Sequence, residues 1–159
     1  MATPKSSIKW SVPMTDPPKL SARQWNMTML LGLVFIATAI LQAASFSDFR
    51  SALDSGLGLS SPGTWGAVLI LAELWAAAAF FKLRLSRAFR MASSLFAVLA
   101  SGFWFFETLR LVSSDIGMLT ANVGFFGRFL IQAPGWWVVV ETSVVLLWTL
   151  WAVNLTKAE

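Results

Sequence analysis

The residues MTMLLGLVFIATAILQAAS, at positions 27–45, run for 19 residues without a charge and decide the fold. A transmembrane α-helix needs about 20 consecutive, mostly apolar residues to cross the roughly 30 Å hydrocarbon core of a bilayer. We therefore expect this stretch to cross a membrane as a helix.

Three further apolar stretches follow along the chain. Positions 65–81 carry only Glu73 as a charged group until Lys82, positions 91–106 are uncharged, and positions 136–153 carry only Glu141. The whole chain is 57% hydrophobic and 13% charged, against about 45–50% and about 25% in soluble domains. We therefore predict an all-α transmembrane four-helix bundle, with helices at about 27–46, 65–82, 89–109 and 136–154.

This predicted transmembrane domain, residues 27–155, follows a polar, Pro-rich tail at 1–26. Segments of that composition form little structure of their own. A different interpretation of the first apolar stretch is a secretory signal peptide, with Lys19 and Arg23 as its basic region and a cleavage site at 42–44. The length of the polar tail favours the transmembrane interpretation.

Basic residues are unequally divided between the two sides of the predicted domain. Nine of the 12 Lys and Arg residues fall in the tails or the turn at 82–90, and three fall in the connections at 46–64 and 107–135. Because cytoplasmic loops carry the excess of Lys and Arg, we expect both termini in the cytoplasm and the protein in the bacterial inner membrane. Four residues are predicted to set this topology and to contact anionic lipids: Lys82, Arg84, Arg87 and Arg90.

The sequence contains no Cys and no His. Thiolate chemistry and thiol exchange are therefore excluded, as are imidazole acid–base catalysis and metal ligation by His. The acidic residues show no metal-ligand spacing, so no metal is predicted. The net charge of +4 does not indicate nucleic-acid binding, because the basic residues flank apolar stretches.

Both connections on the predicted outer side have features of their own. The first, at 46–64, is predicted to form a short interfacial helix that begins after Ser47 and stops at Gly56. The second is long for a helix connection, and we expect it to lie at the membrane interface or to fold over the helices. It contains a polar, glycine-bearing motif followed by further aromatic and basic residues: Asn122, Gly124, Phe125, Phe126, Gly127, Arg128 and Phe129.

In order and spacing, these features resemble the DoxX and MauE-like superfamily of small four-helix membrane proteins. The features are the acidic residue in the stretch 71–74, the basic turn at 82–90, the loop at 122–127 and the Pro-Gly-Trp-Trp sequence at 134–137. The resemblance implies a four-helix membrane fold. The thiol–disulfide role associated with MauE-like proteins does not transfer, because this chain has Val123 and Phe125 where their loop carries cysteines.

Glu73 is the most deeply placed acidic residue of the predicted spans. A carboxyl group at that depth is costly to bury and usually faces other helices. One interpretation is a proton or cation site, or a polar anchor for a quinone-like headgroup. The other is structural, with a protonated or Arg-paired Glu73 fixing the packing of the helices.

The remaining charged residues on the predicted outer side also allow two interpretations. Glu141, Glu107, Arg110 and Arg128 could converge with Glu73 on an outward-facing polar pocket. Alternatively, Glu107 pairs with Arg110 one turn away, and Glu141 pairs with Arg128.

Two groups of residues point to packing and to membrane contact. The run of alanines at 76–79 offers a small-residue face for close helix approach, within the domain or with a partner. The tryptophans that flank the spans are typical of an interfacial aromatic belt, with a pigment or quinone pocket as the other interpretation: Trp25, Trp65, Trp104, Trp136, Trp137 and Trp151.

Two classes of function follow from these observations. The first is a non-catalytic subunit or assembly factor of a larger membrane complex, such as a respiratory or oxidoreductase complex. The second is a small quinone-linked oxidoreductase subunit or carrier that uses Glu73. No cofactor is predicted outright, and a quinone or a lipid is the candidate ligand. The expected partners are the lipid bilayer and other membrane subunits, not nucleic acid.

Overall fold

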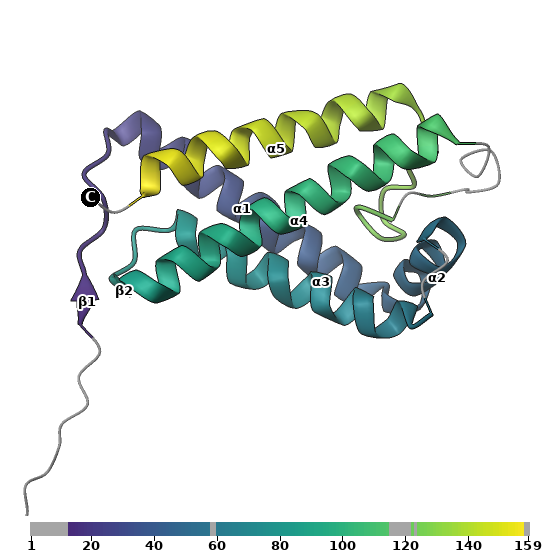
Figure 1. Cartoon of the computed structure of the whole chain (residues 1–159), viewed down its shortest axis with the longest axis horizontal. Coiled ribbons are helices and arrows are strands. Elements are labelled where there is room, and N and C mark those ends of the chain that lie inside the picture. The colour runs from purple at the N-terminus through teal and green to yellow at the C-terminus, as the bar shows by residue number, and fades with distance from the viewer. Residues whose placement is uncertain (1–12, 58–59, 115–121, 123, 158–159) are drawn as a thin grey trace, which may run out of the picture.

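We describe the protein from a computed structural model, which describes residues 13–57, 60–114, 122 and 124–157. Most of these residues are helical (Figure 1). In chain order the elements are β1 (Met14–Thr15), α1 (Ala22–Ala44), α2 (Phe46–Leu57), α3 (Pro62–Ala77), the 3-10 helix η1 (Ala78–Phe80), β2 (Leu85–Ser86), α4 (Arg87–Ser113) and α5 (Trp136–Thr156).

Four helical segments are long and apolar enough to cross a membrane, which confirms the four predicted spans. They are Ala22–Ala44, Pro62–Phe80, Arg87–Ser113 and Trp136–Thr156. In each, less than half of the most apolar part is buried inside the protein. The remaining apolar surface needs a non-aqueous environment, so the chain is a multi-pass membrane protein.

The first span begins earlier than expected, at Ala22 instead of Met27. The reason is a capping box at Ser21: its Oγ accepts a hydrogen bond from the Gln24 amide at 3.3 Å, and the Gln24 Oε1 accepts one from the Ser21 amide at 2.9 Å. This reciprocal pair satisfies two backbone donors at a helix start. Trp25, which the predicted boundary left in the tail, is consequently a buried residue of α1.

The four spans lie alongside one another, with α2 at one end (Figure 1). α4 packs against both α3 and α5, and α1 packs mainly against α3. We call the end that holds α2, Asn122 and residues 124–135 the loop end. We call the other the basic end, because it carries seven of the described Lys and Arg residues: Lys19, Arg23, Lys82, Arg84, Arg87, Arg90 and Lys157.

Two buried clusters hold the helices together, one toward each end. The cluster toward the loop end contains the aromatic residues Phe49, Trp104 and Phe125. The cluster toward the basic end is rich in alanine, which lets helix backbones approach closely. The small-residue face predicted at 76–79 is therefore used within the chain, since Ala76, Ala77 and Ala79 are all buried there.

α2 differs in detail from the predicted interfacial helix. It begins at Phe46 rather than after Ser47, directly beyond the turn at Ser45, whose carbonyl accepts a hydrogen bond from the Phe49 amide at 2.9 Å. Phe49 and Leu53 are fully buried. α2 therefore packs against the spans through one face. Its predicted stop at Gly56 is one residue short of the observed end at Leu57.

A short antiparallel strand pair joins the N-terminal segment to the turn before α4. Met14 pairs with Ser86 and Thr15 with Leu85, and the Thr15 hydroxyl donates to the Leu85 carbonyl at 2.7 Å. The all-α prediction missed this pair, because two-residue strands leave no periodic pattern in the sequence. Residues 13–20 of the predicted tail are thus attached to the helical domain.

Candidate functional site

Glu73 lies in the interior, where three helices meet. Its side chain is 1% exposed, and its Oε1 accepts hydrogen bonds from Trp104 Nε1 of α4 at 2.8 Å and from Gln42 Nε2 of α1 at 3.3 Å. The prediction that Glu73 faces other helices and has a hydrogen-bond partner is confirmed. Of the two structural alternatives, a protonated or an Arg-paired Glu73, the Arg-paired one is wrong, because both donors are neutral. We call Glu73, Gln42 and Trp104 the Glu73 cluster.

Gln42 connects this cluster to the loop end. Its Nε2 also donates to the main-chain carbonyl of Phe125 at 3.0 Å, and the side chain is fully buried. A single amide group therefore bridges the carboxyl group of α3 and the backbone of a segment more than 80 residues further along the chain.

Two acceptor atoms of the Glu73 cluster are buried and have no hydrogen-bond partner within the described part of the chain: Glu73 Oε2 and Gln42 Oε1. Leaving a buried acceptor unsatisfied costs about 1–3 kcal/mol. The cluster therefore offers two acceptors to a proton, to a water molecule or to a ligand that carries hydroxyl groups.

The loop above the cluster is organised by Asn122. Its Nδ2 donates to the Gly127 carbonyl at 2.8 Å, and its Oδ1 accepts from the amides of Gly124 at 3.1 Å and Gln132 at 3.2 Å. Gly124 and Gly127 adopt φ values of +89° and +61°, a region that side-chain-bearing residues rarely enter. These bonds close the loop into a compact turn.

Gly127 also brings the loop against the end of α1. A Cβ atom at this position would collide with Ser45 Oγ and would lie 2.9 Å from the Leu41 carbonyl oxygen. Next along the chain, the Arg128 amide donates to Ser45 Oγ at 3.2 Å. The glycine in the predicted motif is therefore explained by close backbone approach as well as by its conformation.

Phe125 closes the interior beneath this loop. It is buried, and its ring centroid lies 5.2 Å from that of Trp104 in an edge-to-face arrangement. Phe126 is partly buried and packs against the apolar cluster toward the loop end, whereas Phe129 is exposed. Of the two predicted arrangements, the one in which the loop folds over the helices is confirmed at Phe125.

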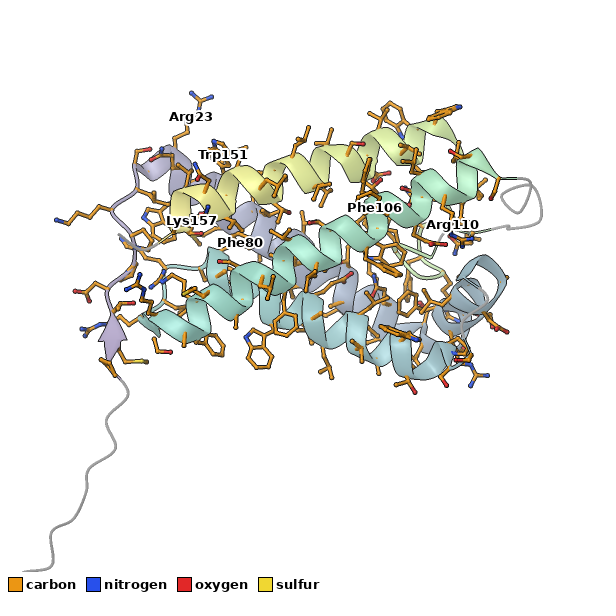
Figure 2. All side chains as sticks on the ribbon, viewed as in Figure 1. Arg23, Phe80, Phe106, Arg110, Trp151 and Lys157 are labelled. Carbon is orange, nitrogen blue, oxygen red and sulfur yellow. The ribbon has the colours of Figure 1, made fainter. Side chains whose placement is uncertain are left out.

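The remaining outer charges do not join Glu73. Glu107 and Arg110 form a two-pronged pair on α4, with Arg110 Nη2 at 2.6 Å from Oε1 and Arg110 Nε at 3.1 Å from Oε2. Figure 2 shows Arg110 near the loop end of α4. The predicted Glu107–Arg110 pair is confirmed, and the interpretation in which all five charges converge is wrong.

The predicted pair between Glu141 and Arg128 is also wrong. Glu141 Oε2 accepts from Gln132 Nε2 at 2.6 Å, and Arg128 lies 4.0 Å from Asp48 of α2. The cause is the attachment of the loop at Ser45, which carries Arg128 toward α2 and leaves Gln132 beside α5.

Sequence reasoning missed two members of the cluster. Trp104 was assigned to the interfacial belt, but it is 2% exposed and is a hydrogen-bond donor to Glu73. Trp136 and Trp137 fit that belt instead, since both are highly exposed at the start of α5. Gln42 was visible as the one amide side chain in an uncharged span, a signal that could have identified it.

The basic turn divides into residues with different surroundings. Lys82 is exposed, and Arg84 pairs with Asp16 at 3.0 Å. Arg87 and Arg90 both lie in the first turn of α4, and Arg90 is almost fully buried. Across the described residues, no group of three acidic side chains is placed to hold a metal ion.

Fold and site together define a polytopic α-helical membrane protein with a buried, hydrogen-bonded glutamate under a folded loop. Comparison with protein-family models, curated proteins and solved structures found no match to this chain. The resemblance to DoxX and MauE-like proteins therefore stays a prediction.

Proposed function

We propose that this protein is a non-catalytic subunit or assembly factor of a larger membrane complex, such as a respiratory or oxidoreductase complex. In this proposal the four spans form a bundle in the bacterial inner membrane, with both termini in the cytoplasm. α5 is the helix that meets the partner subunit.

The exposure of α5 carries this proposal. α5 packs mainly against α4, and 28% of its most apolar part is buried, against 39% in each of the other three spans. Its uncovered face is formed by residues spaced three and four apart, the spacing of a helix-packing stripe: Val140, Val144, Leu147 and Trp151.

The interior supports a structural role for the polar residues. Glu73 is held by groups from α1 and α4, and the Thr108 and Thr142 hydroxyls join α4 to α5 at 2.9 Å. These bonds fix how the helices pack. A chain without Cys and His also lacks the side chains that most often act in catalysis.

Single-cysteine cross-linking tests the proposal, because the natural chain contains no Cys that would need removal. Val144→Cys on α5 and Leu33→Cys on α1 place equally exposed thiols within spans. Each variant is coupled in native membranes to a maleimide with a photoreactive group. We expect Val144→Cys to give an adduct with one polypeptide that also co-purifies at a fixed ratio, and Leu33→Cys to give none. Equal labelling of both variants, together with a single 17.4 kDa chain per particle in light scattering, would refute the proposal.

A second candidate function is favoured by one observation, the unsatisfied acceptors Glu73 Oε2 and Gln42 Oε1. The hydroxyl groups of a quinol could donate to both, as expected for a quinone-linked subunit or carrier. The test is solvent extraction of the purified protein, followed by chromatography for quinones. We expect wild-type protein and Glu141→Gln to retain one quinone per chain and Glu73→Gln to lose it. A wild-type protein free of quinone would exclude this candidate.

A further inference from the structure

A cavity of about 340 Å³ opens at the basic end, between the first turns of α4 and the last turn of α5. Its walls combine basic, hydroxyl and apolar side chains, namely Arg87, Arg90, Lys157, Ser94, Met91 and Val153. We propose that this cavity binds the phosphate group of an anionic membrane lipid, with one lipid bound per chain. The site is separate from the Glu73 cluster and does not depend on the proposed partner subunit.

Arg90 gives the main evidence for an anion-binding site. Its side chain is 2% exposed, and its Nε and Nη1 atoms are buried without any hydrogen-bond partner in the described part of the chain. Its remaining nitrogen, Nη2, makes one long bond of 3.4 Å to the Asp16 carbonyl. Buried guanidinium groups are normally paired, and a phosphate supplies the two-pronged acceptor that fits the guanidinium fork.

No carboxylate among the described residues forms an ion pair with Arg90. The described residues of the cavity wall include no acidic residue. Asp16 accepts from Arg90 through its main-chain carbonyl, while its side chain pairs with Arg84. Lys157, which is exposed, adds a positive charge at the opposite wall. Figure 2 shows Lys157 at the basic end of α5. The cavity therefore holds three cationic groups and no described counter-ion.

The start of α4 strengthens this preference for an anion. A helix N-terminus carries partial positive charge, which acidic side chains ordinarily offset. The first turn of α4 has none and carries Arg87 and Arg90 instead. Ser86 satisfies one amide, that of Phe89, at 3.2 Å. A bound phosphate would offset both the arginines and the helix terminus.

The apolar part of the cavity favours a lipid over a soluble phosphate compound. Met91 and Val153 belong to the same two spans and lie next to the basic groups, and Met91 is highly exposed. A headgroup phosphate at Arg90 would leave its acyl chains alongside this apolar surface of α4 and α5. Basic pockets between spans are a recurrent way to bind anionic lipid headgroups.

Native mass spectrometry of the full-length protein tests the proposal. The protein is released from neutral detergent after addition of phosphatidylglycerol or phosphatidylcholine. We expect one phosphatidylglycerol molecule to be retained and phosphatidylcholine to be retained weakly. Arg90→Gln and Lys157→Gln should each weaken phosphatidylglycerol binding about fivefold or more, as expected for loss of one cation at a lipid phosphate. If Arg90→Gln fails to fold, Lys157→Gln and Arg87→Gln still carry the test.

Lys82→Gln is the matched control, because it removes one charge from the same basic turn at an exposed position outside the cavity. We expect it to leave binding unchanged. An equal loss in Lys82→Gln and Lys157→Gln would overturn the proposal in favour of diffuse attraction to the membrane. Competition by millimolar inorganic phosphate distinguishes a lipid headgroup from free phosphate as the ligand. If phosphate displaces the lipid, the lipid assignment is contradicted. If the lipid stays bound, the assignment is supported.

Discussion

Trp104 Nε1 lies 2.8 Å from Glu73 Oε1, and this buried hydrogen bond joins α4 to α3. The two residues are 31 positions apart in the chain. Their contact gives a buried carboxyl group a defined partner and gives a tryptophan its polar anchor. It is therefore the bond whose removal should be most informative about the interior.

Trp104→Phe keeps an aromatic ring but removes the donor to Glu73. We expect it to lower the free energy of unfolding by more than about 1 kcal/mol. The lost hydrogen bond is worth about 1 kcal/mol, and the smaller ring also leaves unfilled space in the core around Trp104. Thermal unfolding in detergent measures the change. Trp75→Phe is the control, since Trp75 is exposed and stacks on Phe89. If both substitutions have the same effect, the hydrogen bond contributes nothing measurable.

Gly127→Ala should detach the loop from α1. The added methyl group would collide with Ser45 Oγ and would occupy a backbone conformation at φ +61° that alanine disfavours. We expect a loss of about 1–3 kcal/mol. The comparison is Gly102→Ala in the middle of α4, where an added Cβ meets nothing within 4 Å and should be neutral or stabilising by about 0.5–1 kcal/mol. Thermal unfolding of the two variants should therefore shift in opposite directions or by clearly different amounts.

Glu107→Gln should destabilise the protein more than Asp48→Asn. The Glu107 carboxylate is largely buried and accepts two hydrogen bonds from Arg110. In the Asp48–Arg128 pair both side chains are exposed, and the charged atoms are 4.0 Å apart. Exposed pairs contribute about 0–1 kcal/mol, so we expect no measurable change for Asp48→Asn. Chemical unfolding of both variants gives the comparison, and a larger effect of Asp48→Asn would contradict the structural ranking.

Labelling of single introduced cysteines tests the predicted orientation of the protein in the membrane. Lys82→Cys and Phe129→Cys introduce exposed groups at the basic end and the loop end. In intact cells, a membrane-impermeant maleimide should label Phe129→Cys and spare Lys82→Cys until the membrane is opened. The opposite pattern would invert the topology. Labelling of both in intact cells would contradict the single span, α4, that separates the two positions.

The spans were predictable because an uncharged run of sufficient length is a local property of the sequence. The start of α1 also had a signal in the sequence, because Ser21 is followed three residues later by Gln24, the pattern of a capping box. The predicted span began at the uncharged run from Met27 and therefore did not include this signal. The partners of Glu73 were not predictable in this way. Gln42 and Trp104 meet Glu73 because of how three helices rotate against one another, and rotation about a helix axis leaves no local signal in an almost uniformly apolar span.

The loop shows the same division. Its aromatic residues indicated that it lies at the interface or folds over the helices. The partner of Arg128 depended instead on where Ser45 attaches the loop to α1, which no spacing within 107–135 encodes. Arg90 was grouped with three other basic residues by sequence alone. Its burial follows from the helix face on which it lies, one that Lys82 and Arg84, outside α4, do not share.

The strand pair between Met14–Thr15 and Leu85–Ser86 has a consequence for the order of events during synthesis. Thr15 and Leu85 are separated by 70 positions, so the ribosome needs roughly 4–14 s to reach the second strand after the first, at about 5–20 residues per second. Two spans are made during that interval, while the segment before the first of them still lacks its partner. Pairing of the strands therefore cannot precede synthesis of α1 and α3, and any factor that engages residues 13–20 during translation must release them before the strands pair.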